Sequence, residues 1–462
     1  MSAISSSSPA RPGVLAALGL CVLLSALGGS VATVTLPSLA LGFGQPVAAV
    51  QWVVVAYLLA LTTLVVGAGR LSDLWGRRRL LLAGTGLFLL ASLLCAAAPD
   101  LWLLVAARIL QGAGAAVMMA VSMALIGDVI PKDRTGRAMG MMGTLSAIGT
   151  ACGPSVGGLL IQAWGWPLVF LAVAAVAAVV LGLVLLSVPK EPGKDGPHPA
   201  FDLRSMGLLV VALAGYALAM TGTGGMDLSV RGGLLAGAAV VSGLVLWSLR
   251  SSPAPLIRLD LLRDPTLRGS LLMGFLVSAV MMTTLVAGPF YLTQGIGLTA
   301  AQVGVAMSSG PVMSALSATP AGRLVDRFGA DRVTRWGLSG MLIGCGGLAV
   351  QAGIGGWGGY VLALLVLTPG YALFQTANNT GVMRGRAADQ RGVVSGLLNL
   401  SRNLGLVTGA SAMGAVFLWG AGGAVTSAES AASGLRVAFG LALGLVTVAL
   451  LTARVRSKIS LA

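Results

Sequence analysis

The sequence has few of the side chains on which enzymes and metal sites are built. It contains one histidine, four cysteines and 14 acidic residues in 462 positions. Cys21, Cys95, Cys152 and Cys345 all fall in apolar stretches without metal-ligand spacing, so they are better interpreted as small core residues than as ligands or disulfides. His198 lies in a proline-rich segment, and no nucleotide-binding loop or Ser/His/Asp set is present. We therefore predict that the chain is not an enzyme, uses no cofactor or metal, and is not driven by ATP.

Charged residues are also scarce. They make up 9% of the chain, whereas hydrophobic residues make up 56% and the mean hydropathy is +0.93. A soluble globular protein does not have this composition, and a bilayer core of about 30 Å requires about 20 apolar residues per helix. We predict a multi-pass protein of the cell inner membrane or plasma membrane, in contact with the lipid bilayer. The fourteen predicted spans are 14–38, 50–69, 80–98, 101–126, 138–161, 167–188, 205–223, 232–249, 269–293, 303–322, 333–352, 357–382, 393–419 and 434–453.

Most of the positive charge falls on alternate polar segments between these spans. The exceptions among the 29 basic residues are Arg231 and Arg436 in the opposite loops and Arg108 and Arg402 inside spans. Because short cytoplasmic loops of membrane proteins are rich in Lys and Arg, we predict that both termini are cytoplasmic. The net charge of +15 follows from this asymmetry and from attraction to anionic lipid. Binding of nucleic acid is excluded because the bases are dispersed over short loops and form no single face.

The fifth predicted span carries glycines at a regular interval. Gly149, Gly153 and Gly157 recur every four residues, so one helix face has no side chains and a neighbouring backbone can approach it closely. Pro154 removes a backbone hydrogen bond and predicts a bend beside that face. With Gly158, these positions predict a hinge at which two helices can rock. Chance packing of small residues is the alternative, because the chain has 67 glycines.

Two loops of the chain repeat one another. The segment from Gly69 to Arg79 and the segment from Gly322 to Arg332 match in register at Gly, Arg, Leu, Asp, Gly and the last Arg. The repeat indicates a duplication of two halves with six helices each, which is one of the two repeat plans of secondary transporters. The two central spans, the seventh and the eighth, match neither half and lie between proline-containing linkers.

These features together resemble a known family. The glycine string resembles the antiporter motif in the fifth helix of the major facilitator superfamily, and the repeated loop resembles the most specific loop motif of that superfamily. The inserted hairpin resembles the fourteen-helix drug:proton antiporters within it. The resemblance implies an all-α integral membrane protein with the major facilitator fold. The implied domains are an N-terminal six-helix half at 14–188, a linker with two inserted transmembrane helices at 189–268, and a C-terminal six-helix half at 269–454.

The resemblance also implies a gate at the cytoplasmic ends of the spans. Its residues are Gly69, Asp73, Gly76, Arg77 and Asp326. Asp73 is expected to meet the N-terminus of the helix that begins near Val393, where the helix dipole favours an anion. Arg77 is expected to bridge Asp73 to Asp128, and glycines at both ends of each loop permit a tight turn. The alternative is a solvated turn that merely follows the positive-inside rule.

Arg108 and Asp128 are the residues expected to couple transport to protons. A guanidinium about 10 Å inside a span is costly unless it faces protein or water, and the residues around Arg108 resemble the superfamily motif associated with proton coupling. Snorkelling of Arg108 to the outer interface is the alternative. The sequence departs from the fourteen-helix antiporters at Gly28, where they usually carry an acid, and no carboxylate falls at mid-membrane. Coupling then depends on Asp128, Asp73, a substrate proton or water near Arg108.

Polar residues within otherwise apolar spans are the candidates for a substrate pocket between the halves. They are Gln51, Tyr57, Thr283, Tyr291, Gln294, Gln375, Asn378, Asn399 and Arg402. Arg402 has no carboxylate in its own span, so it could bind an anionic group of the substrate or be satisfied by carbonyls, Asn399 and Asn403. The acid-free lining favours neutral, amphipathic or anionic organic molecules over dications.

The predicted function is that of a monomeric secondary transporter. It exports amphipathic drugs or secondary metabolites by alternating access, with proton antiport, so that its partners are a small organic molecule, protons and the bilayer. A proton-independent facilitator and an uptake carrier of the same fold are the alternatives. A non-transporting sensor would require a signalling domain, which the sequence does not suggest.

Overall fold

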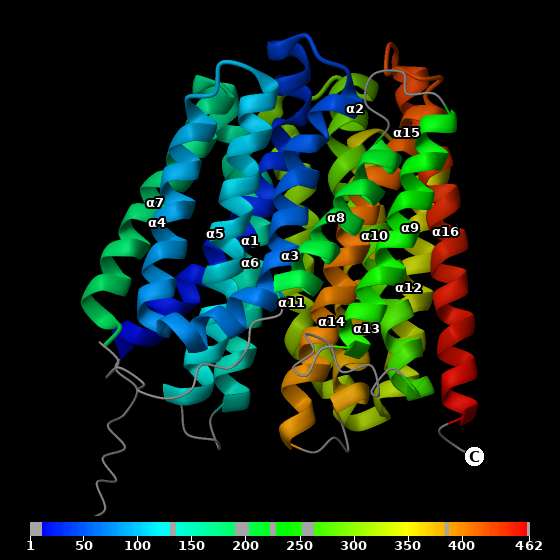
Figure 1. The fold of residues 1–462 in the computed structure, drawn as a ribbon. Coiled ribbons are helices and arrows are strands. Elements are labelled where there is room, and N and C mark those ends of the chain that lie inside the picture. Colours follow the sequence, from blue (N-terminus) through cyan, green and yellow to red (C-terminus); the bar gives the residue numbers. More distant parts are fainter. Residues whose placement is uncertain are drawn as a thin grey trace, which may run out of the picture.

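The structure, a computed structural model, describes residues 12–129, 135–189, 203–221, 228–251, 263–383 and 388–459 (Figure 1). These residues form helices joined by short turns, with no strand among them. The first helices are α1 (Pro12–Phe43), α2 (Val47–Val50), α3 (Trp52–Trp75), α4 (Arg77–Ala96), α5 (Leu101–Val129), α6 (Thr135–Trp164), α7 (Trp166–Ser187), α8 (Leu203–Thr221) and α9 (Leu228–Ser251). The later helices are α10 (Pro265–Phe290), η2 (Tyr291–Gly295), α11 (Ala300–Phe328), α12 (Ala330–Gln351), α13 (Gly356–Met383), α14 (Ala388–Thr408), η3 (Gly409–Met413), α15 (Gly414–Gly420) and α16 (Ala428–Ile459).

Every predicted span falls largely on helical segments, and most of the helices begin before the apolar run that they contain. The span predicted at 269–293 is α10 continued by the π-helix η2, and the span predicted at 393–419 is divided into α14, η3 and α15. Within the described ranges, 10 helical stretches are long and apolar enough to cross a membrane, and α8 and α9 contain shorter apolar stretches at 207–219 and 229–245. The structure supports a multi-pass membrane protein. The count of fourteen crossings stays a prediction.

The helices gather into two bundles with the same internal packing (Figure 1). In the first, α1 packs on α6, α3 on α5, and α4 on both α5 and α7. In the second, α10 packs on α14, α11 on α13, and α12 on both α13 and α16. The pairs correspond in order, as expected for the duplication that the repeated loops indicate. A cavity can therefore form where the two bundles face one another.

The glycine string of α6 allows close packing against α1. A Cβ added at Gly149 would collide with the carbonyl oxygen of Leu23, and one added at Gly153 would lie 2.8 Å from the backbone nitrogen of Val31. The Ser30 hydroxyl donates to the Gly149 carbonyl at 3.3 Å. The close helix contact predicted from the spacing is thus present, and its partner is a helix of the same bundle. The role of this string as a hinge stays a prediction.

The inserted hairpin of α8 and α9 touches both bundles. The two helices pack on one another, and α8 also packs on α3 of the first bundle and on α14, η3 and α15 of the second. The Tyr216 hydroxyl on α8 donates to Thr408 Oγ1 at 3.2 Å, where α14 gives way to η3. The bundles meet along two seams, one between α6 and α11 and one between α3 and α14. The hairpin lies over the seam between α3 and α14.

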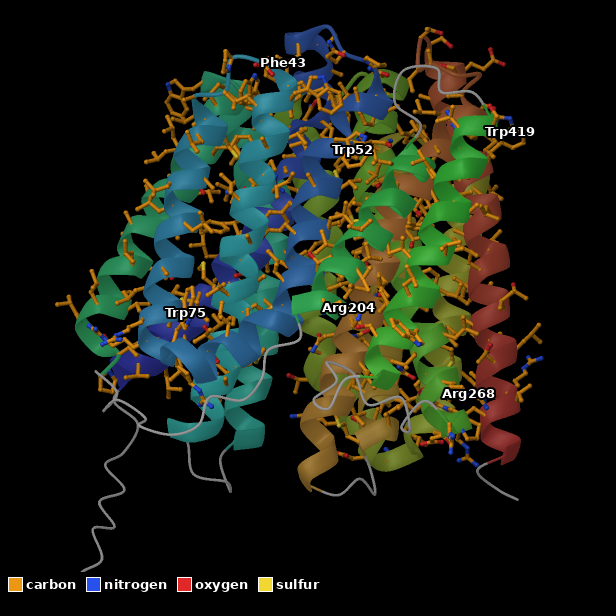
Figure 2. The ribbon with its side chains drawn as sticks, in the orientation of Figure 1. Phe43, Trp52, Trp75, Arg204, Arg268 and Trp419 are labelled. Atoms are coloured by element: carbon orange, nitrogen blue, oxygen red, sulfur yellow. The ribbon has the colours of Figure 1, made fainter. Side chains whose placement is uncertain are left out.

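The two ends of the molecule differ in charge. Figure 2 shows Arg268 near the end at which α3 passes into α4, whereas Phe43, Trp52 and Trp419 lie toward the other end. We refer to the first as the arginine-rich end, because its turns and helix termini carry Arg77, Arg78, Arg79, Arg263, Arg268, Arg323, Arg327, Arg332, Arg335, Arg454 and Arg456. The other is called the opposite end.

Candidate functional site

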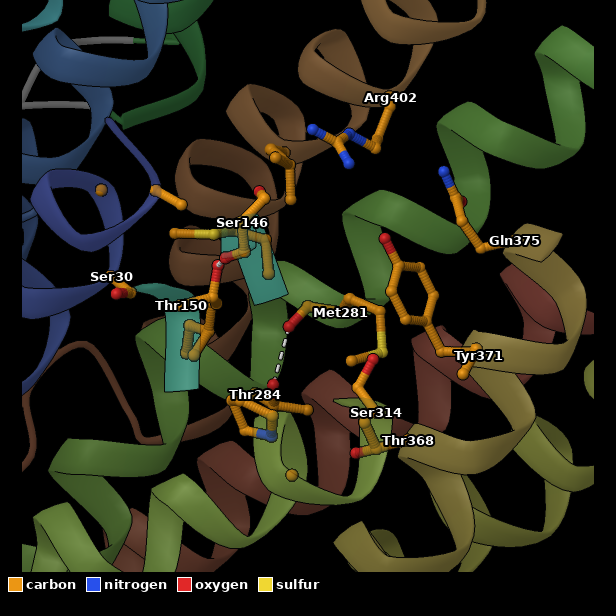
Figure 3. A pocket seen from close by; sticks show the side chains of 18 of the residues that line it. Ser30, Ser146, Thr150, Met281, Thr284, Ser314, Thr368, Tyr371, Gln375 and Arg402 are labelled. Atoms are coloured by element: carbon orange, nitrogen blue, oxygen red, sulfur yellow. Dashed lines mark hydrogen bonds between the residues drawn. The ribbon is translucent and has the colours of Figure 1, made fainter. Parts of the chain in front are cut away.

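A cavity of about 500 Å³ lies between the bundles. Side chains of α1, α3, α5 and α6 line it from one bundle, and side chains of α10, α11, α13 and α14 line it from the other (Figure 3). Its polar lining residues are Ser25, Ser30, Tyr57, Ser146, Thr150, Thr284, Ser314, Tyr360, Thr368, Tyr371, Gln375, Thr376, Asn379, Arg402 and Asn403. Most of the remaining lining is aliphatic or methionine. A cavity of this size suits a drug-sized organic molecule.

Helical periodicity explains which residues reach the cavity. On α13, Thr368, Tyr371, Gln375 and Asn379 line it, and these positions are three or four residues apart. Residues at that interval share one face of an α-helix. On α11 the lining face carries Met307, followed by Pro311 and by the small residues Gly310, Ser314, Ala315 and Ala318. The lining is thus set by one stripe of each helix.

Three of the nine predicted pocket residues line the cavity. They are Tyr57, Gln375 and Arg402. Thr283 and Asn378 do not, although their neighbours Thr284 and Asn379 do. One residue along an α-helix turns a side chain by about 100°, since a turn takes 3.6 residues. Polarity alone therefore does not indicate which residue of each pair, Thr283 and Thr284 or Asn378 and Asn379, faces the cavity.

Three of the predicted residues outside the lining have hydrogen-bond partners within the protein. Thr283 donates to the Ala279 carbonyl at 3.0 Å, and Asn378 Nδ2 donates to the Ser270 carbonyl at 3.2 Å. The Tyr291 hydroxyl accepts a hydrogen bond from the Gly353 backbone at 3.1 Å. Gln51, Gln294 and Asn399 also lie outside the lining. Gln51 is buried against Gly414 of the other bundle, where an added Cβ would lie 2.7 Å from its amide carbon.

Arg108 is fully buried inside the first bundle. Its Nε donates to the Val53 carbonyl at 2.8 Å and its Nη1 to the Gly28 carbonyl at 2.9 Å, and Nη1 also donates to Gln111 Oε1. The guanidinium carbon lies 4.2 Å from the centroid of the Tyr57 ring. No carboxylate of the described residues is among its partners. Arg108 therefore ties α1, α3 and α5 together and does not snorkel to an interface.

Tyr57 connects this buried arginine to the cavity. Its ring contacts Arg108 on one side, it lines the cavity, and its hydroxyl donates to the Ser25 carbonyl at 2.6 Å. A change in the packing of Tyr57 on substrate binding would therefore reach Arg108 directly. The side chain of Asp128, the predicted coupling partner, lies outside the described residues.

Gly28, where the fourteen-helix antiporters usually carry an acid, does not face the cavity. Gly28 is buried and outside the cavity lining, and a Cβ added there would lie 2.9 Å from Phe88 Cζ. Gly29 does line the cavity, and its added Cβ would have an ordinary contact of 3.4 Å with Tyr57. An acid that faces the cavity thus belongs at residue 29 and not at residue 28.

We expect Gly29→Asp to improve the binding of tetraphenylphosphonium to the purified protein about tenfold, because it supplies a counter-charge in a weakly polar cavity. Gly28→Asp is the matched control, and we expect it to lower the thermal midpoint without improving binding, since its side chain collides with Phe88. An equal gain in affinity from Gly28→Asp would contradict this placement.

The two bundles meet closely between α6 and α11. A Cβ added at Gly158 would collide with the Ala300 carbonyl, and one added at Gly304 would collide with the Pro154 carbonyl. The Ser155 hydroxyl donates to Ser308 Oγ across the same contact. Pro154 and Gly158 thus face the other bundle, whereas Gly149, Gly153 and Gly157 face α1.

This contact lies toward the opposite end, because α6 ends there at Trp164 and α11 begins there at Ala300. Near it, Gln162 Oε1 accepts a hydrogen bond from the Ala301 backbone at 3.3 Å. Figure 1 shows that the bundles converge toward the opposite end and splay toward the arginine-rich end. The contact between α6 and α11 therefore closes the cavity at the opposite end.

The repeated loops lie at the arginine-rich end. Gly76 and Gly329 have φ angles of 86° and 82°, so the tight turns occur there. Gly69 and Gly322 lie inside α3 and α11, which corrects the expectation that glycines at both ends of each loop form the turn. Arg77 donates to the Ala124 carbonyl of α5 at 3.1 Å. The side chain of Asp73 is outside the described residues, and Asp326 is exposed.

One buried arginine was missed because the positive-inside rule marked it as a solvated charge. Arg456, 5% exposed, donates to Ser270 Oγ at 2.7 Å, Asn378 Oδ1 at 3.1 Å and Asp331 Oδ1 at 2.8 Å. These bonds tie α16 to α10, α13 and α12. No spacing in the sequence indicates this set, because its members come from four separate helices.

The sequence of the chain is similar to those of a known family and of several named transporters. The model of the Major Facilitator Superfamily matches residues 18–410. The chain is 30% identical to the uncharacterized transporter YebQ of Escherichia coli (strain K12), over 87% of this chain and 88% of the relative. It is 27% identical to the riboflavin transporter RibZ of Clostridioides difficile (strain 630), over 87% and 88%. It is 30% identical to the multidrug resistance protein Stp of Mycobacterium tuberculosis (strain CDC 1551 / Oshkosh), over 87% and 75%.

A solved structure has the same fold. It is a bacterial homolog of the human lysosomal transporter Spinster in an inward-facing and occupied conformation, with a TM-score of 0.73 at 16% identity over 98% of this chain and 97% of the other. The likeness covers 98% of this chain, and at 16% identity it shows the fold alone.

Proposed function

The chain belongs to the Major Facilitator Superfamily, and from this premise we propose that it exports amphipathic organic molecules from the cell by alternating access, with protons as the exchanged ion. As a member of this family it is a transporter of small molecules and not an enzyme. The observation that carries the proposal is the cavity between the two bundles, closed toward one end by the contact of α6 with α11.

The charge of the two ends supports an orientation. Cytoplasmic loops are the ones rich in arginine and lysine, so the arginine-rich end is proposed to face the cytoplasm, with both termini on that side. The described conformation is then closed toward the outside. A single chain supplies both sides of the cavity, which supports a monomer as the working unit. The domains proposed are 14–188, 189–268 and 269–454.

The lining supports a substrate that is largely apolar. Leucines and methionines from several helices share the wall with scattered hydroxyls, and such a mixed surface accepts amphipathic molecules without fixed hydrogen-bond geometry. Relatives named for multidrug resistance and for riboflavin transport are consistent with organic substrates of this kind. A fourteen-helix drug:proton antiporter is the subfamily that the inserted hairpin supports.

Asp128 and Arg108 are the residues proposed to couple transport to protons. No acid lines the cavity among the described residues, so we propose that Asp128 exchanges the proton and that Arg108, which contacts Tyr57, adjusts it through the packing of the first bundle. A proton-independent facilitator is the second candidate, and the acid-free lining is the observation that favours it.

Everted membrane vesicles that contain the full chain provide the test. Imposed acidification of the vesicle interior is expected to drive accumulation of a labelled organic substrate, and a protonophore is expected to abolish it. Transport that follows the substrate gradient regardless of pH would replace the antiporter with the facilitator. Accumulation confined to right-side-out vesicles would indicate uptake.

Substitution of the first-loop acid tests the proposed gate at the arginine-rich end, made of Gly69, Asp73, Gly76, Arg77 and Asp326. We expect Asp73→Asn to slow turnover about tenfold while leaving the substrate dissociation constant within about twofold, because a contact made in one conformation biases the equilibrium between conformations. Asp326→Asn is expected to do less, since its side chain is exposed in the poorer copy of the loop. Equal and negligible effects of the two substitutions on the transport rate would contradict the proposed gate.

A further inference from the structure

The cavity contains one charged side chain among its described lining residues, Arg402. Its Nε is buried and has no hydrogen-bond partner, and no carboxylate of the described residues lines the cavity. Figure 3 shows Arg402 beside Gln375 and Tyr371 of α13, with its guanidinium pointing away from Gln375. A buried donor without a hydrogen-bond partner is unfavourable until an acceptor approaches it.

The backbone of α14 fixes this orientation. On a neighbouring face of the helix, the Ser401 hydroxyl donates to the Leu271 carbonyl at 2.5 Å, and Gly405 packs so closely on α10 that an added Cβ would collide with the Phe275 carbonyl. The helix therefore cannot roll away from α10 without breaking that packing. Arg402, Asn403 and Leu406 consequently stay on the cavity side.

Two other buried arginines each have several hydrogen-bond partners in this protein, although Nη2 of Arg108 has none. Arg108 donates to two carbonyls and to Gln111, and Arg456 donates to Asp331, Ser270 and Asn378. Neither lines the cavity. Arg402 has no comparable set of partners, so its donors are available to a ligand.

The rest of the lining defines the body of that ligand. Tyr57, Tyr360 and Tyr371 supply ring surface, and Met119, Met281, Met282 and Met307 supply polarizable, adaptable surface. Flat, apolar molecules pack well on such walls. An organic cation finds no acid in the described lining and meets the charge of Arg402.

We propose that Arg402 is the anion-binding group of the cavity and that the preferred substrates are organic monoanions, carboxylates or phenolates, with a planar apolar body. This rests on the proposed function in that the cavity is taken as the transport site. The bidentate fork of arginine suits a carboxylate, and a charge-assisted hydrogen bond of this kind is about twice as strong as a neutral one.

Binding to the purified full-length protein in lipid nanodiscs tests the assignment without any transport step. The probes share one skeleton and differ in charge: 2-anthracenecarboxylate, 2-anthracenecarboxamide and 2-(aminomethyl)anthracene, at about pH 7, where the carboxylate is ionised. For the unmodified protein we expect the carboxylate to bind about tenfold more tightly than the amide, and the amine to bind most weakly.

Arg402→Gln is expected to reduce the preference for the carboxylate over the amide to less than about threefold, and Arg402→Lys to retain part of it. Arg263→Gln removes the same charge from an exposed site at the arginine-rich end and should leave the preference unchanged. Thermal unfolding of each variant establishes that it is folded.

A carboxylate preference that survives Arg402→Gln, or tighter binding of the amide or the amine by the unmodified protein, would overturn the assignment. Failure of the proposed export function has a different signature. In that case the carboxylate preference and its loss in Arg402→Gln persist in nanodiscs, while everted vesicles show no accumulation of the carboxylate.

Discussion

Oxidation of a protein that carries Ser155→Cys and Ser308→Cys is expected to stop transport almost completely, and reduction is expected to restore it. The two native hydroxyls are in hydrogen-bond contact across α6 and α11, so cysteines at these positions lie within reach of a disulfide. In alternating access this contact must part in every cycle for the cavity to open toward the outside. A covalent link there holds the protein in the conformation described here.

The native cysteines must be removed before this cross-linking experiment. Cys21, Cys95 and Cys345 are buried, but Cys152 is exposed on α6, so all four are best replaced first. The single variants Ser155→Cys and Ser308→Cys are the controls and should transport normally under oxidation. Full activity of a protein shown by mass spectrometry to be cross-linked would mean that the contact between α6 and α11 does not gate the cavity.

Arg108→Ala is the second substitution with a large expected effect. It leaves the carbonyls of Gly28 and Val53 and the amide oxygen of Gln111 without their charged donor in a buried site. Hydrogen bonds to a charged group contribute about 1.5–3 kcal/mol each, so we expect a loss of roughly 3 kcal/mol in stability after partial relaxation. We also expect gradient-driven efflux to fall at least tenfold, about 1.4 kcal/mol or more in the barrier.

Separate assays distinguish a structural role of Arg108 from a role in coupling. Gradient-driven efflux and substrate exchange without a gradient are measured on the same vesicles, and the thermal midpoint is measured on purified protein. Loss of the first with retention of exchange is expected for coupling. Arg108→Lys should rescue poorly, because one ammonium cannot reach acceptors on α1, α3 and α5 in the planar arrangement of the fork. Parallel loss of both activities would assign Arg108 to helix packing alone.

The fold was more predictable than the cavity. Hydrophobic length and glycine spacing located the long helices and the close contact of α6 with a neighbour, because those signals extend over many residues. The lining depends on single side chains. Thr283 and Thr284 have the same chemistry in the sequence, yet only Thr284 faces the cavity. An error of one residue in helical phase cannot be detected from composition, but it determines which side chains face the cavity.

Contacts between residues far apart in the sequence explain why other predicted residues lie outside the cavity. Asn378 was predicted to bind substrate, but Arg456, 78 residues away in the sequence, holds its amide oxygen. Gln51 was predicted for the same pocket and lies against Gly414, which belongs to the other bundle. Nothing local to Asn378 or Gln51 signals either partner. Arg402 does line the cavity, and its Nε has no partner in the structure; its role as a substrate-binding residue stays a prediction.

The α8–α9 hairpin constrains the proposed rocking of the two bundles. Because α8 packs on α3 and on the segment from α14 to α15, it can follow one bundle as they rock and must slide along the other. Movement at that seam is therefore shear rather than simple opening. Lipid borders the sliding surface, so bilayer thickness and acyl-chain order act on the balance between the two conformations from outside the protein.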